Sequence, residues 1–515
     1  MTTKNPAIRT RFAPSPTGFV HIGSLRTALF SFLFARHNGG VHVLRIEDTD
    51  QNRFVEGAIE NLLKVMKQMG IDFDEGFYLK ENGEVGLSTE ASAKVEERGE
   101  FGPYLQSKRL DLYHKHAEEL IKNKKAYYCF CSEQRLEELR KEQTALKKPP
   151  MYDRLCRNLS DDEINKQLAE FKAAGKNPVV RFAIPLEGQT VIHDLVYGDI
   201  TYEHKILDDQ VIIKSDGFPT YHLAVVIDDH YMKISHVIRG EEWIPSTPKH
   251  LLIYQALGWE PTQFAHLPLI VNPDKTKLSK RQGDVSVEDF LQKGYLKEAL
   301  INFVAFLGWN PKTEQELFSL KDLIKQFDLS KINKSGAVFD PGKLDWINSH
   351  YIRQMPIEEL TDRLIPYWQE AKLATHEFLQ KKDYLAAIAN LEKERLKKLS
   401  EIGERTKYFF EAPDYDPSLL VWKKSDKNKT KQALTGLADL LSKTGNFGRE
   451  NLETTIKQFI AENNYDNGSV LWPFRAALTG QEKSPGPFEV CATLALGLGK
   501  KEILKRLETA IGKLG

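Results

Sequence analysis

Residues 9–34, RTRFAPSPTGFVHIGSLRTALFSFLF, constrain the fold of this chain more than any other segment. Residues 8–13 predict a short strand, which ends at the following prolines and glycine because proline lacks a backbone donor and glycine frees the backbone. A helix is predicted from about Gly23, because apolar side chains recur at helical spacing at Leu25, Ala28, Leu29, Phe32 and Leu33. A strand, a turn and a helix in this order predict the first βαβ unit of a parallel sheet.

The predicted turn between this strand and helix suits an anion. The N-terminus of a helix carries unpaired N–H groups and a partial positive charge, which together bind phosphate well. His21 lies at the mouth of the predicted helix and could donate a hydrogen bond to the same anion. The segment is therefore a candidate phosphate site.

Length and composition exclude some classes of protein and leave others open. With 515 residues the chain is too long for one core, so roughly three to five domains are expected. Lys+Arg and Asp+Glu both number 72, so the net charge neither supports nor opposes a nucleic-acid partner. The sequence shows no membrane-length apolar run, no signal-peptide core, and four cysteines that do not look like a disulfide framework. We therefore expect a soluble, cytoplasmic protein with no membrane partner.

Two distant motifs resemble the signatures of one family. Residues 13–18, APSPTG, followed by His21–Ile22–Gly23–Ser24, resemble the "HIGH" motif of glutamyl-tRNA synthetases, which are class I aminoacyl-tRNA synthetases; Ser24 replaces the last His. Residues 277–281, KLSKR, resemble the second class I signature. A lone KxxK would be an ordinary solvated basic loop, whereas the pair of motifs favours a phosphate clamp over ATP.

The resemblance implies adenylation of an amino acid. In this reaction the amino-acid carboxylate attacks the α-phosphorus of ATP, and the protein supplies positioning and charge neutralisation rather than a covalent nucleophile. The catalytic residues implied are His21, Lys277 and Lys280, with Mg²⁺ on the phosphates. The implied ATP-binding residues are His21, Gly23, Glu242, Ile270, Lys277, Leu278, Ser279, Lys280 and Arg281. No Walker A or GxGxxG turn occurs, so a P-loop ATPase and a dinucleotide enzyme are disfavoured.

A second predicted strand, residues 41–46, ends in a run of acidic residues, 47–50. Ligands of open parallel sheets bind beyond the carboxyl ends of strands, although Asp48 or Asp50 could equally cap the next helix. The segment RIEDTD resembles a family motif in which Glu47 receives the α-ammonium of glutamate. Because glutamate carries two carboxylates and one ammonium, its pocket needs two donor clusters and one anion. The implied glutamate-binding residues are Arg11, Ala13, Ser15, Glu47, Tyr221, Val225 and Arg239.

Residues 215–230 resemble another family signature, SDGxPTYxxAxxxDD. A tyrosine in an apolar strand is more often a core residue, but this signature places Tyr221 in the substrate pocket. Val225 stands where some relatives place Asn, which puts the polar contact there in question. In the family, the residue matching Arg11 binds the side-chain carboxylate and the one matching Arg239 contacts the α-carboxylate side. When an arginine faces the side-chain carboxylate of glutamate in a dry pocket, binding glutamine instead costs on the order of several kcal/mol, because the neutral amide leaves the arginine unpaired.

Cysteines 129, 131 and 156 form a partial zinc pattern. Some family members carry Cys-x-Cys followed by Cys-x-His here, and a structural Zn²⁺ wants four ligands. In this chain Asn158 occupies the position of the final His, so no fourth ligand is evident. Bound zinc and ordinary cysteines in a small fold both remain open.

The predicted fold class is α/β, and the resemblance implies the domain order. It implies a Rossmann-like catalytic domain (1–110 and 221–255), an inserted α+β acceptor-stem domain (111–220), a helical connecting domain with the KLSKR loop (256–355) and an all-α anticodon-binding domain (356–515, with a break near 410). We expect a surface loop over residues 76–102. Residues 471–480, LWPFRAALTG, resemble a bacterial C-terminal signature. Arg395, on a helix predicted over 384–410, is the candidate reader of the third anticodon base. The basic face 393–398 could contact phosphates or be an ordinary solvated face.

Together these features predict a bacterial-type enzyme that ligates L-glutamate to tRNA(Glu) through glutamyl-adenylate, with release of AMP and pyrophosphate and with tRNA bound before activation. Charging of tRNA(Gln) stays open, and a monomer is expected. The short glutamyl-queuosine enzyme lacks the helical C-terminal region, and the glutaminyl enzyme carries a β-barrel anticodon module. A catalytically silent tRNA-binding scaffold is a different class of answer, opposed by the intact His21, Glu47, Arg239, Lys277 and Lys280.

Overall fold

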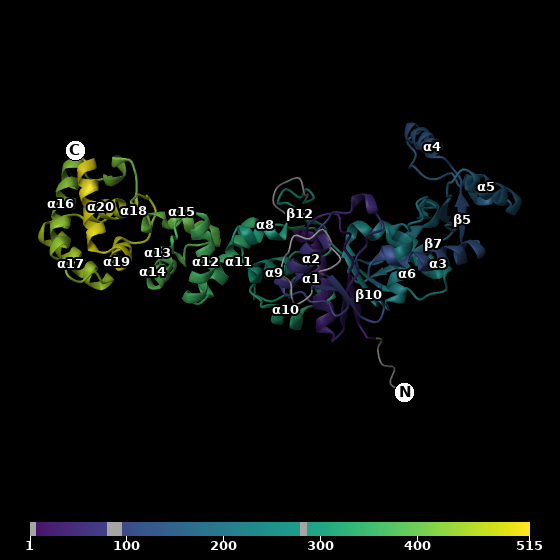
Figure 1. Cartoon of the computed structure of the whole chain (residues 1–515), viewed down its shortest axis with the longest axis horizontal. Coiled ribbons are helices and arrows are strands. Elements are labelled where there is room, and N and C mark those ends of the chain that lie inside the picture. Colours follow the sequence, from purple (N-terminus) through teal and green to yellow (C-terminus); the bar gives the residue numbers. More distant parts are fainter. Residues whose placement is uncertain (1–6, 80–94, 279–285) are drawn as a thin grey trace. The chain divides into compact units, whose positions relative to one another are not determined.

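The computed structural model describes residues 7–79, 95–278 and 286–515. The chain divides into two compact units (Figure 1). Unit 1 contains Met1–Phe290 and Leu300–Asp340, and unit 2 contains Leu291–Ala299 and Pro341–Gly515. Ser279, Lys280 and Arg281, three of the predicted ATP-binding residues, lie outside the described residues.

Unit 1 is built on a six-stranded sheet in the order β2-β1-β10-β11-β7-β8. Every neighbouring pair from β2 to β7 is parallel, and only β7 and β8 pair antiparallel. The strands are β1 (Arg9–Phe12), β2 (Val41–Leu44), β7 (Gln189–Asp194), β8 (Gly198–Glu203), β10 (His236–Gly240) and β11 (Gln263–Leu267). A central parallel sheet with helical crossovers confirms the predicted α/β, Rossmann-like class.

Three strands of this sheet lie outside the ranges expected for the catalytic domain. Strands β7 and β8 fall within 111–220, the range assigned to the inserted domain, yet they extend the catalytic sheet beyond β11. Strand β11 lies past residue 255, where the second catalytic half was expected to end. The polar alternation of β7 and β8 predicts strands but carries no information about which sheet they join.

Helix α1 (Ile22–His37) follows β1 as the sequence predicts. Its apolar residues from Ile22 to Ala35 are buried except Phe34, which is half-buried, and the backbone ends the helix at Asn38 and Gly39, the latter at φ 62°. His21 caps the N-terminus, since its side chain accepts a hydrogen bond from the backbone N–H of Ser24. The next helix of the sheet, α2 (Ala58–Met69), begins and ends at glycines with positive φ.

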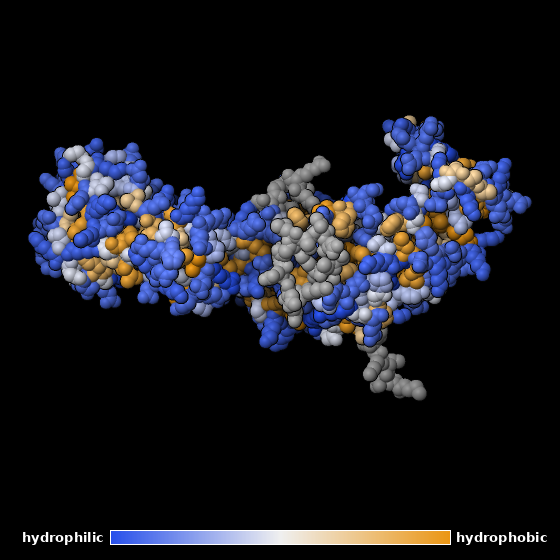
Figure 2. All heavy atoms as spheres, viewed as in Figure 1, coloured by the Kyte–Doolittle hydropathy of each residue, from blue (hydrophilic) through white to orange (hydrophobic). Residues whose placement is uncertain are grey.

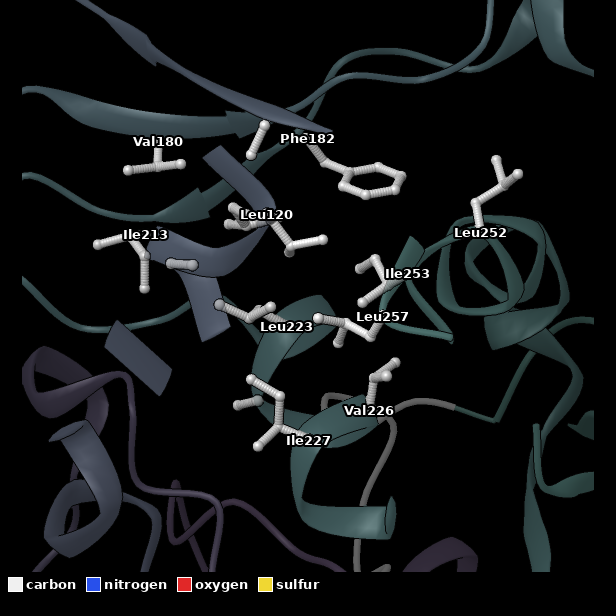
Figure 3. Close-up of a cluster of buried hydrophobic side chains, with 14 of the residues drawn as sticks. Leu120, Val180, Phe182, Ile213, Leu223, Val226, Ile227, Leu252, Ile253 and Leu257 are labelled. Atoms are coloured by element: carbon white, nitrogen blue, oxygen red, sulfur yellow. The ribbon is translucent and has the colours of Figure 1, made fainter. Parts of the chain in front are cut away.

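One apolar core of unit 1 joins the catalytic sheet region to the insert (Figure 3). It contains side chains of α3 (Leu110–Lys122), α6 (Tyr221–Tyr231) and α7 (Thr247–Ala256), together with those of a small sheet of β5 (Ala126–Cys129), β6 (Val179–Phe182) and β9 (Val211–Ile213). Fully burying each Leu, Ile or Phe contributes about 1.5–3 kcal/mol.

Tyr221 begins helix α6 rather than lying in a strand, because Pro219 and Thr220 break the apolar run just before it.

The remaining insert elements are helical. Helices α4 (Glu133–Ala145) and α5 (Asp161–Ala173) have no buried residues, and Figure 1 shows both at the end of β5. Ser160 and Glu163 form a capping box at the start of α5. The expected α+β character of the insert is therefore present in α4, α5 and the sheet β5-β6-β9.

The expected surface loop 76–102 is in part a hairpin. Strands β3 (Gly76–Leu79) and β4 (Val95–Arg98) pair antiparallel on either side of residues outside the described range. The hydroxyl of Tyr78 donates to Glu96 at 2.5 Å across this pair. The high glycine and glutamate content concealed the two short strands.

The expected connecting domain, 256–355, is divided between the units. Strands β12 (Ile270–Val271) and β13 (Ala337–Val338) pair in unit 1, and α10 (Leu320–Gln326) belongs there too. Helices α8 (Val287–Gln292) and α9 (Lys297–Ala305) each cross a boundary between the units, whereas α11 (Pro341–Gln354) lies in unit 2.

All regular elements of unit 2 are helices, as predicted. After α11 come α12 (Ile357–Glu370), α13 (His376–Leu379), α14 (Lys382–Glu392), α15 (Ile402–Thr406), α16 (Lys427–Lys443), α17 (Arg449–Glu462), α18 (Asn467–Thr479), α19 (Pro487–Leu498) and α20 (Lys500–Lys513). The single helix predicted over 384–410 is wrong, because α14 ends at Glu392 and α15 starts at Ile402.

Among the described residues, no helix is both long enough and apolar enough to cross a membrane. Figure 2 shows polar residues over most of the visible face, with apolar residues in smaller patches between them.

Candidate active site

A pocket of about 540 Å³ opens at the carboxyl ends of β1 and β10. This is the edge where open α/β sheets bind ligands. The segment after β1, the start of α1, the turn after β10 and the segment after β12 all line it. It brings together eight of the predicted site residues: Ser15, His21, Gly23, Arg239, Glu242, Ile270, Lys277 and Leu278.

The imidazole of His21 is held against the first turn of α1. The backbone N–H of Ser24 donates to Nδ1 at 3.2 Å, and the Ser24 hydroxyl lies 3.1 Å from Nε2. A Cβ at Gly23 would lie 3.0 Å from Cε1 of His21, closer than side chains normally approach. The His-x-Gly spacing therefore lets the ring fold over the helix N-terminus, where N–H groups favour an anion.

Lys277 reaches the same pocket from the segment after β12. The chain turns over residues 272–276, and the backbone N–H of Leu278 then donates to the carbonyl of Ile270 at 3.1 Å. This antiparallel return places Lys277 opposite Val271. The structure therefore unites one end of the KLSKR segment with His21.

Arg239 ends β10 as a buried cation whose partners are neutral. Its Nη1 donates to the hydroxyl of Tyr221 at 2.9 Å, and its Nη2 donates to the Thr247 hydroxyl at 2.7 Å. Its Nε donates to Nε2 of His266 at 3.2 Å, and Nδ1 of His250 lies 3.4 Å from Nη1. Arg239 is 5% exposed and has no carboxylate partner among the described residues. A desolvated guanidinium of this kind requires an anion from a ligand.

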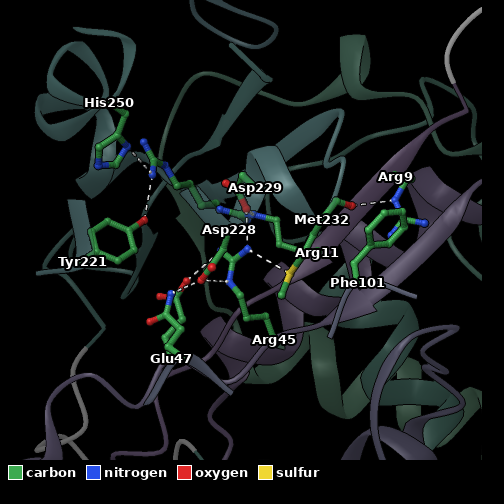
Figure 4. A network of polar contacts seen from close by, with 12 residues as sticks. Arg9, Arg11, Arg45, Glu47, Phe101, Tyr221, Asp228, Asp229, Met232 and His250 are labelled. Atoms are coloured by element: carbon green, nitrogen blue, oxygen red, sulfur yellow. Dashed lines mark hydrogen bonds and ion pairs between the residues drawn. The ribbon is translucent and has the colours of Figure 1, made fainter. Parts of the chain in front are cut away.

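A second network, behind the pocket, centres on Arg45 (Figure 4). Arg45 donates to Asp229 at 2.7 Å and to Glu47 at 3.0 Å, and Nε of Arg11 donates to Asp229 at 3.2 Å. Burial raises the pKa of Glu47, and Arg45 and Arg11 oppose this shift. Burial would raise the pKa of Asp229 as well, but Arg11 and Arg45 more than offset it, so that pKa is lowered. The network fixes Glu47 and Arg11 at one end of the sheet.

The adjacent carboxylate, Asp228, accepts hydrogen bonds from protein side chains that hold the fold together. It accepts from Arg109 at 2.7 Å, from Gln106 at 2.8 Å and from the hydroxyl of Tyr113 at 2.9 Å. The family motifs assign no role to Arg45, Asp228 or Asp229. The paired aspartates of residues 228–229 were a usable signal, because two carboxylates in an apolar helix need cationic partners.

Of the predicted glutamate-binding residues, Ser15 and Arg239 line this pocket, and Ala13 and Val225 have no polar side-chain group to offer a ligand. Val225 is 2% exposed and belongs to the apolar core of Figure 3, and its side chain offers no polar contact, in keeping with the doubt raised by the sequence. Ala13 is half-buried between two lining residues, Phe12 and Pro14, and offers only its backbone.

The three predicted zinc ligands converge. Their sulfur atoms all lie within 4.8 Å of one another. The hydroxyl of Tyr152 lies 3.5 Å from Sγ of Cys129 and 3.4 Å from Sγ of Cys131, and it accepts from the backbone N–H of Cys156 at 3.0 Å. Asn158 is exposed. The Tyr152 hydroxyl, which the sequence pattern did not identify, is therefore a fourth polar atom beside the three sulfurs, and a structural Zn²⁺ takes four ligands.

Arg395, the predicted anticodon reader, lies just after α14. Its Nη1 donates to Glu392 at 2.8 Å, and its side chain is 30% exposed. Burial raises the pKa of Glu392, although Arg395 and Arg405 oppose this. The guanidinium is thus held in place but remains partly accessible.

Comparison with known proteins gives matches to both units. A family model described as "tRNA synthetases class I (E and Q), catalytic domain" matches residues 7–346, and one described as "Anticodon binding domain" matches residues 359–511. The glutamate–tRNA ligase of Dehalococcoides mccartyi is 44% identical over 508 residues, 98% of each chain. That of Clostridioides difficile is 44% identical over 506 residues, 97% of this chain and 98% of the relative.

A solved structure is similar over the full length. The crystal structure of a glutamate tRNA ligase from Elizabethkingia meningosepticum, in complex with its amino acid, matches with a TM-score of 0.86 and 34% identity, covering 99% of this chain and 100% of that one.

Proposed function

This chain belongs to the glutamate–tRNA ligases of the class I tRNA synthetase family, and from that membership we propose a role for each group in the pocket. The enzyme uses ATP to attach glutamate to tRNA for protein synthesis, through a glutamyl-adenylate intermediate.

ATP, carrying Mg²⁺ on its phosphates as part of the substrate, lies over the N-terminus of α1. Gly23 leaves room for the His21 ring, and His21 stabilises the α-phosphate as the glutamate carboxylate attacks it. Lys277, from the opposite wall of the pocket, neutralises the leaving pyrophosphate. Lys280 completes this clamp. Glu242, Ile270 and Leu278 line the part of the pocket that receives the nucleoside.

Glutamate lies beside Arg239 and Tyr221. The observation that carries this assignment is the buried guanidinium of Arg239, whose described partners are all neutral. A carboxylate of the substrate supplies the missing charge. Arg11 binds the other carboxylate, and Glu47 receives the ammonium while Arg45 holds it in place.

Pyrophosphate exchange tests this assignment in the wild-type enzyme. We expect ATP–pyrophosphate exchange that depends on glutamate, requires tRNA and is not supported by glutamine, because the neutral amide deprives Arg11, which is assigned to the side-chain carboxylate, of a charged partner in the substrate. Exchange supported equally by glutamine would contradict the carboxylate pocket. Exchange absent with and without tRNA would favour a scaffold.

The Cys129, Cys131 and Cys156 thiolates and the Tyr152 hydroxyl are the proposed zinc ligands. When bound, zinc would cross-link β5 to the η4 turn (Leu155–Asn158) and so hold the insert together. It has no part in the chemical steps.

The insert, which contains β5, β6, β9, α4 and α5, is proposed to bind the acceptor stem of the tRNA. Unit 2 is proposed to bind the anticodon, which is supported by the match of residues 359–511 to an anticodon-binding model. Arg395 and the 393–398 face are the candidate anticodon and phosphate contacts. We propose tRNA(Glu) as the main substrate. Charging of tRNA(Gln) is tested by aminoacylation with each purified tRNA. A monomer in the cytoplasm is the proposed working form, which sedimentation of the purified enzyme and cell fractionation test.

A further inference from the structure

Three neighbouring strands place a chain of buried polar groups beneath the pocket. Arg239 of β10 and His266 of β11 are register partners, and Asp194 ends β7 on the other side of β11. Nδ1 of His266 lies 2.6 Å from Oδ2 of Asp194, and Nε2 of His266 lies 3.2 Å from Nε of Arg239. Neither His266 nor Asp194 lines the pocket, and His266 is 0% exposed.

The contacts of Asp194 determine which nitrogen of His266 carries the proton. Asp194 accepts from the backbone N–H groups of Val196 and Tyr197 at 2.9 and 2.8 Å, and from the backbone N–H of His266 at 3.2 Å. At 2.6 Å from this acceptor, Nδ1 must be the protonated nitrogen. Nε2 is then left with a lone pair, which accepts from Nε of Arg239.

A proton on Nε2 of His266 would repel the guanidinium of Arg239. It would place the Nε–H of Arg239 and the Nε2–H of His266 against each other at 3.2 Å, and only Oγ1 of Thr247, also 3.2 Å from Nε2, could then accept from the ring among the described contacts of this nitrogen. Burial lowers the pKa of His266 despite the opposing effect of Asp194, so the ring stays neutral near neutral pH. The imidazole therefore works as a fixed acceptor.

The guanidinium of Arg239 is held at each of its nitrogens. Nε donates to His266, Nη1 to Tyr221, and Nη2 to Thr247, with His250 lying near Nη1. Five N–H groups are available, and one on Nη2 has no partner among the residues that the structure describes. A planar fork held at its other donors presents this remaining N–H in one direction, where one carboxylate oxygen of a ligand can accept it.

We propose that Asp194 and His266 are positioning residues for glutamate: Asp194 fixes the His266 tautomer, and His266 fixes the plane of Arg239 toward the substrate carboxylate. This inference rests on the proposed role of Arg239. Because Asp194 ends β7, it also links the β7–β8 hairpin to amino-acid recognition.

The test measures the KM for glutamate and the KM for ATP in tRNA-dependent pyrophosphate exchange. His266→Gln keeps an acceptor near the Nε2 position, whereas His266→Asn is too short to reach Arg239. We expect His266→Asn to raise the KM for glutamate by about 10- to 100-fold with the KM for ATP unchanged, the effect of losing one hydrogen bond to a charged group. His266→Gln should change it by no more than about threefold, because the bond is retained.

His42→Asn is the matched control. His42 is also 0% exposed and lies on β2, where Nδ1 contacts the carbonyl of Asp72 at 3.1 Å, away from the pocket. It should leave both KM values unchanged. Equal loss in His266→Gln and His266→Asn, or a parallel rise in the KM for ATP, would show a merely structural role and overturn the proposal.

A double-mutant cycle separates the proposal from its premise. Once Arg239→Gln has removed the guanidinium, adding His266→Asn should raise the KM for glutamate by less than about twofold. Full additivity would overturn the positioning role. An unchanged KM in Arg239→Gln itself would instead overturn the assignment of Arg239 to the substrate.

The tautomer can be measured without relying on a folded His266→Asn variant. Nitrogen chemical shifts of ¹⁵N-histidine-labelled wild-type enzyme, with His266 assigned through His266→Gln, should show the Nδ1–H form. A protonated Nε2 would overturn the proposal.

Discussion

Nη1 of Arg45 and Oδ1 of Asp229 form an ion pair of 2.7 Å in which neither side chain is appreciably exposed. Arg45 follows β2 and Asp229 lies on α6, so the pair joins segments from the two halves of the nucleotide-binding fold. Because Arg45 also holds Glu47 and Asp229 also holds Arg11, the pair sets the positions of both charged groups assigned to glutamate. Charge balance behind the pocket thus supports recognition within it.

Asp229→Asn should destabilise unit 1 strongly. It would leave Arg11 and Arg45 buried without their shared carboxylate, a change that costs about 3–5 kcal/mol. Urea unfolding followed by tryptophan fluorescence measures the loss. Asp199→Asn is the control, since Asp199 is 69% exposed and pairs only with His193. Equal stability of the two variants would contradict a structural role for the network.

Lys277→Ala should lower kcat for pyrophosphate exchange by about 10²- to 10³-fold, the usual cost of removing one group that stabilises charge in the transition state. The KM for glutamate should change little, because Lys277 is assigned to the ATP phosphates rather than to the amino acid. Lys275→Asn tests whether the loss of any positive charge from this segment lowers kcat. Lys275 is exposed at φ 68°, a conformation that Asn tolerates, and its loss should leave kcat unchanged. Similar losses in both variants would contradict a specific role for Lys277.

Enzyme purified without chelators should contain one zinc ion per chain by elemental analysis. Cys156→Ser should abolish binding, and Tyr152→Phe should weaken it by about 10- to 100-fold while leaving three thiolates in place. Cys491→Ser changes a buried cysteine in unit 2 and should retain full zinc content. Zinc-free wild-type enzyme would exclude the site, and normal affinity in Tyr152→Phe would exclude Tyr152 as a ligand.

Acid should destabilise unit 1 partly through His42. Burial lowers the pKa of His42 to about 4, below the ordinary value of 6.5. A lowered folded-state pKa means that its contribution is complete above pH 6.5 and is lost as the pH falls from 6.5 toward 4, because the unfolded chain takes up the proton first. When the pH is lowered from 7.5 to 5, the free energy of unfolding should fall further in wild type than in His42→Asn, and the difference should be about 2 kcal/mol. Identical pH dependence in the two proteins would refute this.

The first strand, turn and helix were predictable because their signals are local. Pro14, Pro16 and Gly18 end a strand, and apolar spacing from Leu25 to Leu33 specifies a helix. The convergence of His21 and Lys277 was predictable only through the family resemblance, and the shared pocket confirms that they lie together. Their catalytic roles remain predictions.

The groups that sequence reasoning missed depend on contacts between distant segments. No local pattern indicates that β7 joins β11, and so none places Asp194 beneath Arg239. Tyr152 was missed as a ligand candidate because it lies outside the cysteine spacing, and Val225 was assigned to the pocket although α6 turns it into the core. The packing of distant segments, rather than residue spacing, determines which face of a helix is buried and which strands are neighbours in a sheet.

Pyrophosphate exchange by His21→Asn tests the central claim, that the ring over the α1 N-terminus acts on the ATP phosphates. Asparagine retains the N-cap acceptor for the backbone N–H of Ser24 and removes only the imidazole. With glutamate and tRNA saturating, we predict a kcat lower by about 10²-fold or more, with normal glutamate binding by equilibrium dialysis. Exchange at the wild-type rate in this variant would contradict the account.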